Sequence, residues 1–272
     1  MDALLFTSTA GAYLLAAGSF FVGLFRGDAA TRLPTAVLLF GFIVHTIALT
    51  SRFFQEGFAA VAVTGEALLF HAWLMVGIYL VMQLKYHLVV LGGIISPLAF
   101  LMTVAAFAVA GGSGEIPPGF RTFWLPLHVT LAFLGNAVFA LAFGVSLIYL
   151  LQERRLKHKK ITALMKRFPS LESLDRLNYT LLVWGFPLMT LGILTGSMWA
   201  GIHWGHYWSW DPRQISSGIV WVLYGALLHG RVTAGLRGKK AALLTMFGFC
   251  VVLGYFLLGE TIFPTRHGGR FE

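Results

Sequence analysis

Residues 204–214 read Trp204-Gly205-His206-Tyr207-Trp208-Ser209-Trp210-Asp211-Pro212-Arg213-Gln214; an apolar run, 178–199, precedes them, and a second, 213–230, begins at their last two residues. A helix needs about 20 apolar residues to cross the hydrocarbon core of a bilayer, and lipid offers no partner to unpaired backbone groups. Both runs are therefore predicted to be membrane-spanning helices. The stretch between them is predicted to be a loop at the membrane surface.

This loop is crowded with flat aromatic side chains. Within eight positions it carries Trp204, Tyr207, Trp208 and Trp210, beside a histidine and a carboxylate. One interpretation is an interfacial belt, in which Trp and Tyr lie at the level of the lipid headgroups. The other is a stacking platform for a large planar ligand. Belt residues are usually spread over many helix ends, so their concentration in one loop favours the platform.

The whole chain has the composition of an integral membrane protein. Of its 272 residues, 57% are hydrophobic and 11% are charged, whereas ordinary soluble domains carry about 25% charged residues. We predict an all-α, polytopic membrane helix bundle, a single domain over residues 1–272 with the Trp-rich loop at about 199–214. Its predicted spans are 3–24, 35–50, 66–84, 88–110, 124–150, 178–199, 213–230 and 241–263. Cys250 is the only cysteine, which excludes an intrachain disulfide.

The basic residues predict the orientation of the bundle. If the first connection lies inside, fifteen of the twenty Lys and Arg residues fall on inner segments, and five fall on outer segments, namely Arg52, Arg121, Arg213, Arg266 and Arg270. Cytoplasmic segments carry an excess of Lys and Arg, so both termini and the Trp-rich loop are expected to face outward. The basic run 154–160 is then an anchor near anionic lipid, and binding of nucleic acid is disfavoured. The chain shows no nucleotide-binding motif.

The motif WGHYWSWDP resembles the tryptophan-rich "WWD" signature of haem-handling proteins in cytochrome c maturation. The most similar group is the CcsA/ResC type of cytochrome c synthase subunit, with CcmC and CcmF as more distant relatives. The resemblance extends from about residue 40 to the end of the chain. It departs after Pro212, where Arg213-Gln214 replaces the usual Lys-Glu and is closer to the CcmC form.

The resemblance implies a haem-binding subunit of a cytochrome c synthase (haem lyase). Such a protein would lie in the bacterial inner membrane and present haem b at its periplasmic face, for covalent attachment to the CxxCH cysteines of apocytochrome c. A ResB/CcsB-type membrane partner, absent from this chain, is also implied. Three alternatives stay open: a non-catalytic haem chaperone or exporter, a quinol-linked haem b membrane subunit, and a transporter or channel.

Two histidines are predicted to lie at the depth of the Trp-rich loop. An imidazole in a membrane span is costly to bury, and neutral imidazole is a common axial ligand of haem iron. His128 lies at the outer end of the fifth span, and His267 follows the eighth. Each alone could be an ordinary interfacial histidine; with the platform between them, the pair could hold an iron from both faces. The resemblance matches Leu127-His128-Val129 to the family's outer histidine, and matches His267 by position.

Other polar residues have two interpretations each. His229 lies 17 residues after Pro212, roughly 26 Å along a helix, so it is predicted to be an inner haem ligand or a histidine at a helix C-terminus. Asp211 before Pro212 is predicted to cap the seventh span, and could also orient Arg213 or an indole. Arg213 is a candidate partner for a haem propionate. His45, in mid-span, is predicted to be packed and hydrogen-bonded.

Overall fold

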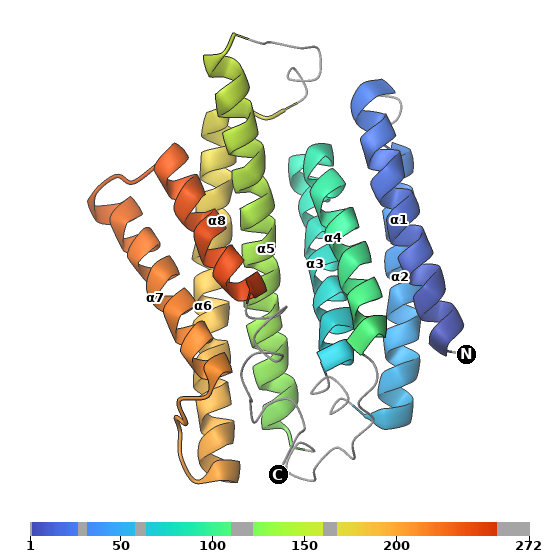
Figure 1. Cartoon of the computed structure of the whole chain (residues 1–272), viewed down its shortest axis with the longest axis vertical. Helices are drawn as coiled ribbons and strands as arrows, with labels where there is room; N and C mark the ends of the chain where they lie inside the picture. Colours follow the sequence, from blue (N-terminus) through green and yellow to red (C-terminus); the bar gives the residue numbers. More distant parts are fainter. Residues whose placement is uncertain (1, 27–31, 58–63, 110–121, 160–167, 255–272) are drawn as a thin grey trace. The chain divides into compact units, whose positions relative to one another are not determined.

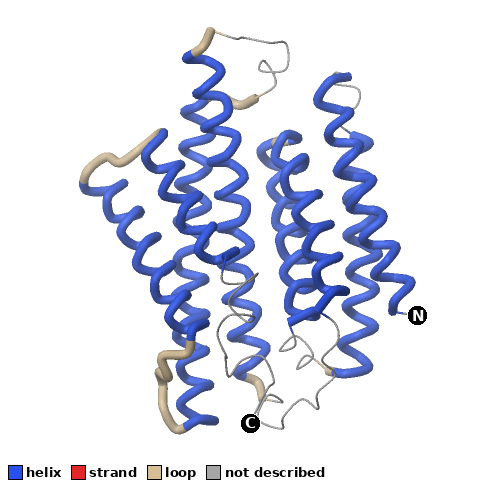
Figure 2. The backbone as a smooth tube through the Cα atoms, viewed as in Figure 1, coloured by secondary structure: helices blue, strands red, loops and turns tan. Residues whose placement is uncertain are grey.

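The computed structural model describes residues 2–26, 32–57, 64–109, 122–159 and 168–254. These residues form eight α-helices and no strand (Figures 1 and 2). The helices are α1 (Asp2–Arg26), α2 (Arg32–Glu56), α3 (Thr64–Tyr86), α4 (Val89–Val109), α5 (Trp124–Lys157), α6 (Leu171–Trp204), α7 (Pro212–Thr233) and α8 (Lys239–Gly254). All but α8 are long and apolar enough to cross a membrane. The prediction of an all-α, polytopic membrane bundle is confirmed. The C-terminal part of the predicted eighth span lies outside the described residues.

The long helices α5 and α6 continue past the apolar runs that predicted them. Each has 34 residues, whereas the predicted spans were 124–150 and 178–199. Hydropathy detects only the part of a helix that matches the hydrocarbon core. Backbone hydrogen bonds continue into the polar region as long as the sequence favours them, and the N-cap Ser170 starts α6 well before its apolar part.

The chain divides into two compact units. One contains α1–α4 and comprises Met1–Ser113 with Arg155–Pro169; the other contains α5–α8 and comprises Gly114–Arg154 with Ser170–Glu272. The expectation of a single integral membrane domain over residues 1–272 stays a prediction.

In the first unit, α1 packs against α2 and α4, and α3 packs against α4. The prediction that His45 is packed and hydrogen-bonded is confirmed. Its ring is fully buried, and Nδ1 shares a hydrogen bond of 2.9 Å with the Tyr13 hydroxyl. Trp73 stacks between Phe42 and Phe70, with ring centroids 5.6 and 5.9 Å apart, and its indole N–H donates to the Thr46 hydroxyl.

In the second unit, α5 and α6 pack closely through glycines. A Cβ added at Gly135 would lie 2.9 Å from the backbone of Met189, and one added at Gly192 would lie 2.9 Å from the backbone of Ala132. Small residues let helix backbones approach in this way. Since the partner number on α6 rises as the number on α5 falls, the two helices run antiparallel. The start of α5 therefore lies beside the end of α6.

A polar network stabilises the middle of this unit. The buried Asn178 of α6 donates to the Ser146 hydroxyl of α5 at 2.8 Å and to the Thr245 hydroxyl of α8 at 3.3 Å. Tyr224 of α7 donates its hydroxyl to the Thr245 carbonyl at 3.2 Å. Its ring also stacks on Phe139 of α5, with centroids 3.9 Å apart. The network thus links all four helices of the unit.

Replacing Asn178 with Ala should therefore lower the stability of the protein. The change removes the donor that links three helices, and buried interhelical hydrogen bonds in membrane proteins contribute about 1 kcal/mol. We expect a lower midpoint of thermal unfolding in detergent. Thr180→Ala is the control, because the Thr180 hydroxyl donates to the Arg176 carbonyl of its own helix. Equal midpoints for the two variants would contradict a stabilising role for the network.

Candidate functional site

The Trp-rich loop is anchored by a helix end on each side. Helix α6 ends at Trp204, followed by Gly205 in the left-handed region with φ 76°, a conformation that glycine adopts without steric cost. Helix α7 begins at Pro212 with Asp211 as its N-cap, and the Asp211 carboxylate accepts the Arg213 backbone N–H at 2.9 Å. The predicted capping role of Asp211 is therefore confirmed. The loop between them comprises residues 205–211.

Large aromatic surfaces of this loop are accessible. Tyr207 is 70% exposed and Trp210 is 75% exposed. Trp208 packs edge-on against Trp210, with centroids 5.8 Å apart and planes at 89°, and its far edge lies against Gly218 of α7. Trp210 has a φ of 54°, which is unfavourable for a bulky residue and is a kind of strain that clusters at functional sites. The loop thus exposes aromatic rings, and its backbone is strained at Trp210.

A second group of stacked aromatic rings lies at the end of α6. Trp199 is buried, stacks on His203 with centroids 4.9 Å apart, and meets Trp204 edge-on at 4.9 Å. Nδ1–H of His203 donates to the Trp199 carbonyl at 3.0 Å. Sequence reasoning missed Trp199. Its spacing of four and five residues from His203 and Trp204, about one turn of helix, was the available signal.

Gln214 also has a role that the sequence did not reveal. Its side-chain carbonyl accepts both the backbone N–H of Ser209, at 2.8 Å, and the Ser209 hydroxyl, at 3.0 Å. These bonds tie the middle of the loop to the first turn of α7. Gln214 belongs to the Arg213-Gln214 pair in which this chain departs from the related motif. Arg213 is half-buried, and its pairing with a ligand carboxylate stays a prediction.

His128 has its orientation set by α6. Its imidazole lies against Gly196, where a Cβ would come within 2.5 Å of Cε1. Nδ1 lies 2.7 Å from the carbonyl oxygen of Gly192. A carbonyl only accepts, so Nδ1 carries a proton, and in the neutral ring Nε2 then carries the lone pair. Metal-ligating histidines are typically oriented by such a bond from the other ring nitrogen.

The antiparallel packing places His128 on the same side of the unit as the loop. Gly196 precedes Trp204 by eight residues, about 12 Å along the helix. His229 lies instead toward the far end of α7, where its side chain is exposed. His267 falls outside the described residues. The roles of His128, His229 and His267 as ligands stay predictions.

The residues present fit a flat macrocycle that contains iron. Neutral imidazole with a lone pair on Nε2 is a suitable axial donor. Exposed indole and phenol rings offer stacking surface of the kind that planar ligands use. Within the described residues, no group of three or more His, Cys, Asp and Glu side chains gathers as a metal site.

Comparisons with known proteins agree on one family. Residues 61–261 match the family model described as Cytochrome C assembly protein. The chain is 32% identical to a cytochrome c biogenesis protein CcsA from Pyropia yezoensis, over 84% of this chain and 85% of that protein. It is 35% identical to CcsA from Chlamydomonas reinhardtii, over 72% of this chain and 57% of that protein.

A solved structure shares the fold. The cytochrome c haem lyase CcmF aligns with a TM-score of 0.67 at 16% identity, over 99% of this chain and 52% of that protein.

Proposed function

Because the chain belongs to the family of cytochrome c assembly proteins, we propose that it binds haem b at its Trp-rich loop and presents it to apocytochrome c. Attachment would be to the CxxCH cysteines, with this chain as the haem-binding subunit of a cytochrome c synthase. When bound, haem supplies the groups that react with those cysteines. The residues of this chain bind it, orient it and limit its exposure to water.

The observation that carries this proposal is the hydrogen bond from His128 to Gly192. It fixes a proton on Nδ1, so the neutral ring has its lone pair on Nε2, the form that ligates haem iron. His267 is the proposed second axial ligand.

The remaining residues of the proposed site have distinct roles. The exposed rings of the loop would stack against the macrocycle, namely Tyr207, Trp208 and Trp210. Trp204, which packs edge-on against Trp199 at the end of α6, would extend the stacking surface. Arg213 would bind a propionate through its planar guanidinium.

The membrane arrangement completes the proposal. The charge distribution favours a topology with both termini and the Trp-rich loop on the periplasmic side of a bacterial inner membrane. His229 lies about 26 Å along α7 from Pro212, so it would serve an inner haem site. A ResB/CcsB-type protein is the proposed membrane partner.

The protein purified from haem-replete cells should carry haem b, seen as a Soret band and a pyridine haemochrome spectrum. Trp208→Ala should lower the haem content, because it removes a stacking surface. Stacking on one aromatic side chain contributes about 1–3 kcal/mol to the binding of a nucleic-acid base, which is also a flat ligand. Added imidazole should not restore it, since the change removes a surface and not a ligand. Trp184→Ala is the control, as Trp184 is an exposed tryptophan in the body of α6. A pigment-free protein that also takes up no haem on reconstitution would refute the proposal.

A further inference from the structure

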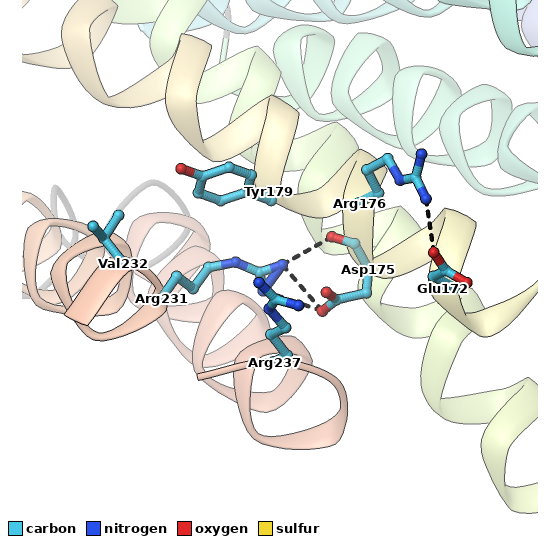
Figure 3. Close-up of a pocket in the computed structure, with 7 residues that line it drawn as sticks. All are labelled: Glu172, Asp175, Arg176, Tyr179, Arg231, Val232 and Arg237. Atoms are coloured by element: carbon cyan, nitrogen blue, oxygen red, sulfur yellow. Dashed lines mark hydrogen bonds and ion pairs between the residues drawn. The ribbon is translucent and has the colours of Figure 1, made fainter. Parts of the chain in front are cut away.

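A polar pocket lies at the end of the second unit opposite the Trp-rich loop. It has a volume of about 450 Å³, and its walls come from the first turns of α6, the last turns of α7 and the loop between α7 and α8 (Figure 3). Three arginines and two carboxylates line it, with one tyrosine and one valine: Arg176, Arg231, Arg237, Glu172, Asp175, Tyr179 and Val232. The proposed haem site does not use this pocket.

Arg231 forms the fixed wall of the pocket. It is only 7% exposed, and its guanidinium donates to the Asp175 carboxylate at 3.1 Å and to the Asp175 carbonyl at 2.8 Å. The Tyr179 ring lies 5.2 Å from it in a cation–π contact. The same Asp175 oxygen also accepts the Gly238 backbone N–H at 2.9 Å. The charge of Asp175 is therefore engaged by Arg231 and by the loop.

Arg237 leaves an uncompensated positive charge beside this pair. Within the described residues its side chain makes no hydrogen bond or ion pair, although it lies close enough to Arg231 for the two charges to repel. Figure 3 shows both arginine side chains directed toward the Asp175 side of the pocket. The third arginine, Arg176, is already paired with Glu172 at 2.7 Å. The pocket thus lacks one negative charge.

The loop that carries Arg237 is fixed. Gly235 and Gly238 both adopt positive φ, at 63° and 67°, and the Leu236 N–H donates to the Gly230 carbonyl at 3.0 Å. These are the features of a glycine-dependent helix C-terminus. The backbone position of Arg237 between two such glycines is thus set, so this segment need not be ordered at the moment of binding.

We propose that this pocket binds the phosphate headgroup of an anionic phospholipid. A phosphate would add the missing negative charge and accept hydrogen bonds from the Arg237 guanidinium in its planar fork. The rim is suited to acyl chains, because Val232 is 73% exposed and Tyr179 is 37% exposed. Two exposed lysines, Lys239 and Lys240, come directly after the loop that carries Arg237. Basic pockets between membrane helices on the cytoplasmic side are a known form of lipid recognition, and the predicted topology places this end there.

The test is native mass spectrometry of the detergent-solubilised protein, titrated with phosphatidylglycerol and, separately, with phosphatidylcholine. The unmodified protein should bind phosphatidylglycerol more tightly. Arg237→Ala should weaken that binding about fivefold, the equivalent of the ~1 kcal/mol that one basic residue contributes near an anionic leaflet. Arg154→Ala removes an exposed arginine of α5 outside the pocket and should leave the affinity unchanged.

Other results would overturn the assignment. Equal losses in the two variants would mean that general surface charge binds the lipid. Equally strong binding of inorganic phosphate, measured by its competition with phosphatidylglycerol, would make the pocket a free-phosphate site. Arg237→Ala should also keep the haem content of the unmodified protein; loss of haem with unchanged lipid binding would assign the pocket to a haem carboxylate. Haem binding itself can fail without affecting the lipid titration, so the two proposals are separable.

Discussion

Gly196→Ala should remove most of the haem ligation and most of the cytochrome c maturation that depend on His128. The added Cβ would lie 2.5 Å from Cε1 and 2.6 Å from Nδ1 of the imidazole, so the ring must leave its position. Leaving that position breaks the hydrogen bond to the Gly192 carbonyl. A catalytic group misplaced by about 1 Å can cost on the order of 100-fold in rate, and we expect a loss of that order in maturation of a reporter cytochrome.

A double-mutant cycle separates ligand placement from helix packing. In a His128→Gly background supplied with imidazole, Gly196→Ala should have little further effect, because the ring that it displaces is gone. Gly11→Ala is the matched control. It is also a glycine within a helix, and a Cβ there meets nothing within 4 Å. If Gly196→Ala were as harmful without the His128 ring as with it, Gly196 would serve the contact between α5 and α6 and not the ligand.

His128→Gly should abolish maturation and regain it with imidazole. The change opens one coordination position and leaves a cavity against Gly196 that matches the lost ring. Added imidazole has the same donor atom and nearly the same shape. A structural histidine would behave differently, since its loss costs a hydrogen bond of about 1–3 kcal/mol that free imidazole seldom restores. The measurement is maturation of a reporter cytochrome, and the haem spectrum, with and without imidazole.

His267→Gly is the companion variant. If both histidines ligate the iron, each single variant should respond to imidazole in the same way. Rescue of His128→Gly alone would remove His267 from the proposal. Full activity of both variants without imidazole would be incompatible with axial ligation by either residue.

Much of the fold could be predicted because the signals are local. Apolar runs predicted the helices, and Asp211 followed by Pro212 predicted the start of α7, which the structure confirms. The predicted start of α5 at residue 124 is correct, whereas α5 continues past its predicted C-terminal end and α6 extends past both of its predicted ends. Hydropathy detects only the part of a helix that matches the hydrocarbon core, and backbone hydrogen bonds continue beyond it. The aromatic loop could be recognised as well, because its rings are neighbours along the chain.

The contacts that orient the polar residues of the site and the pocket could not be read from the sequence. The sequence could not show that the His128 ring packs against Gly196 and bonds to the Gly192 carbonyl. The charge pattern placed Arg231 among fifteen inner basic residues and did not distinguish it from the others. In the structure Arg231 is buried and bonded to Asp175. Trp199 and Gln214 were missed although their partners lie only four or five residues away along the chain, because these contacts depend on where α6 ends and α7 begins.

The sequence by itself determined the membrane environment, the helices and the aromatic loop, because hydrophobic burial and helix capping act over neighbouring residues. Tertiary structure decided which ring nitrogen of His128 donates a hydrogen bond and which carboxylate pairs with Arg231. Both depend on a carbonyl or carboxylate more than fifty residues away along the chain. Only the packing of α5 and α7 against α6 brings those groups within hydrogen-bonding distance.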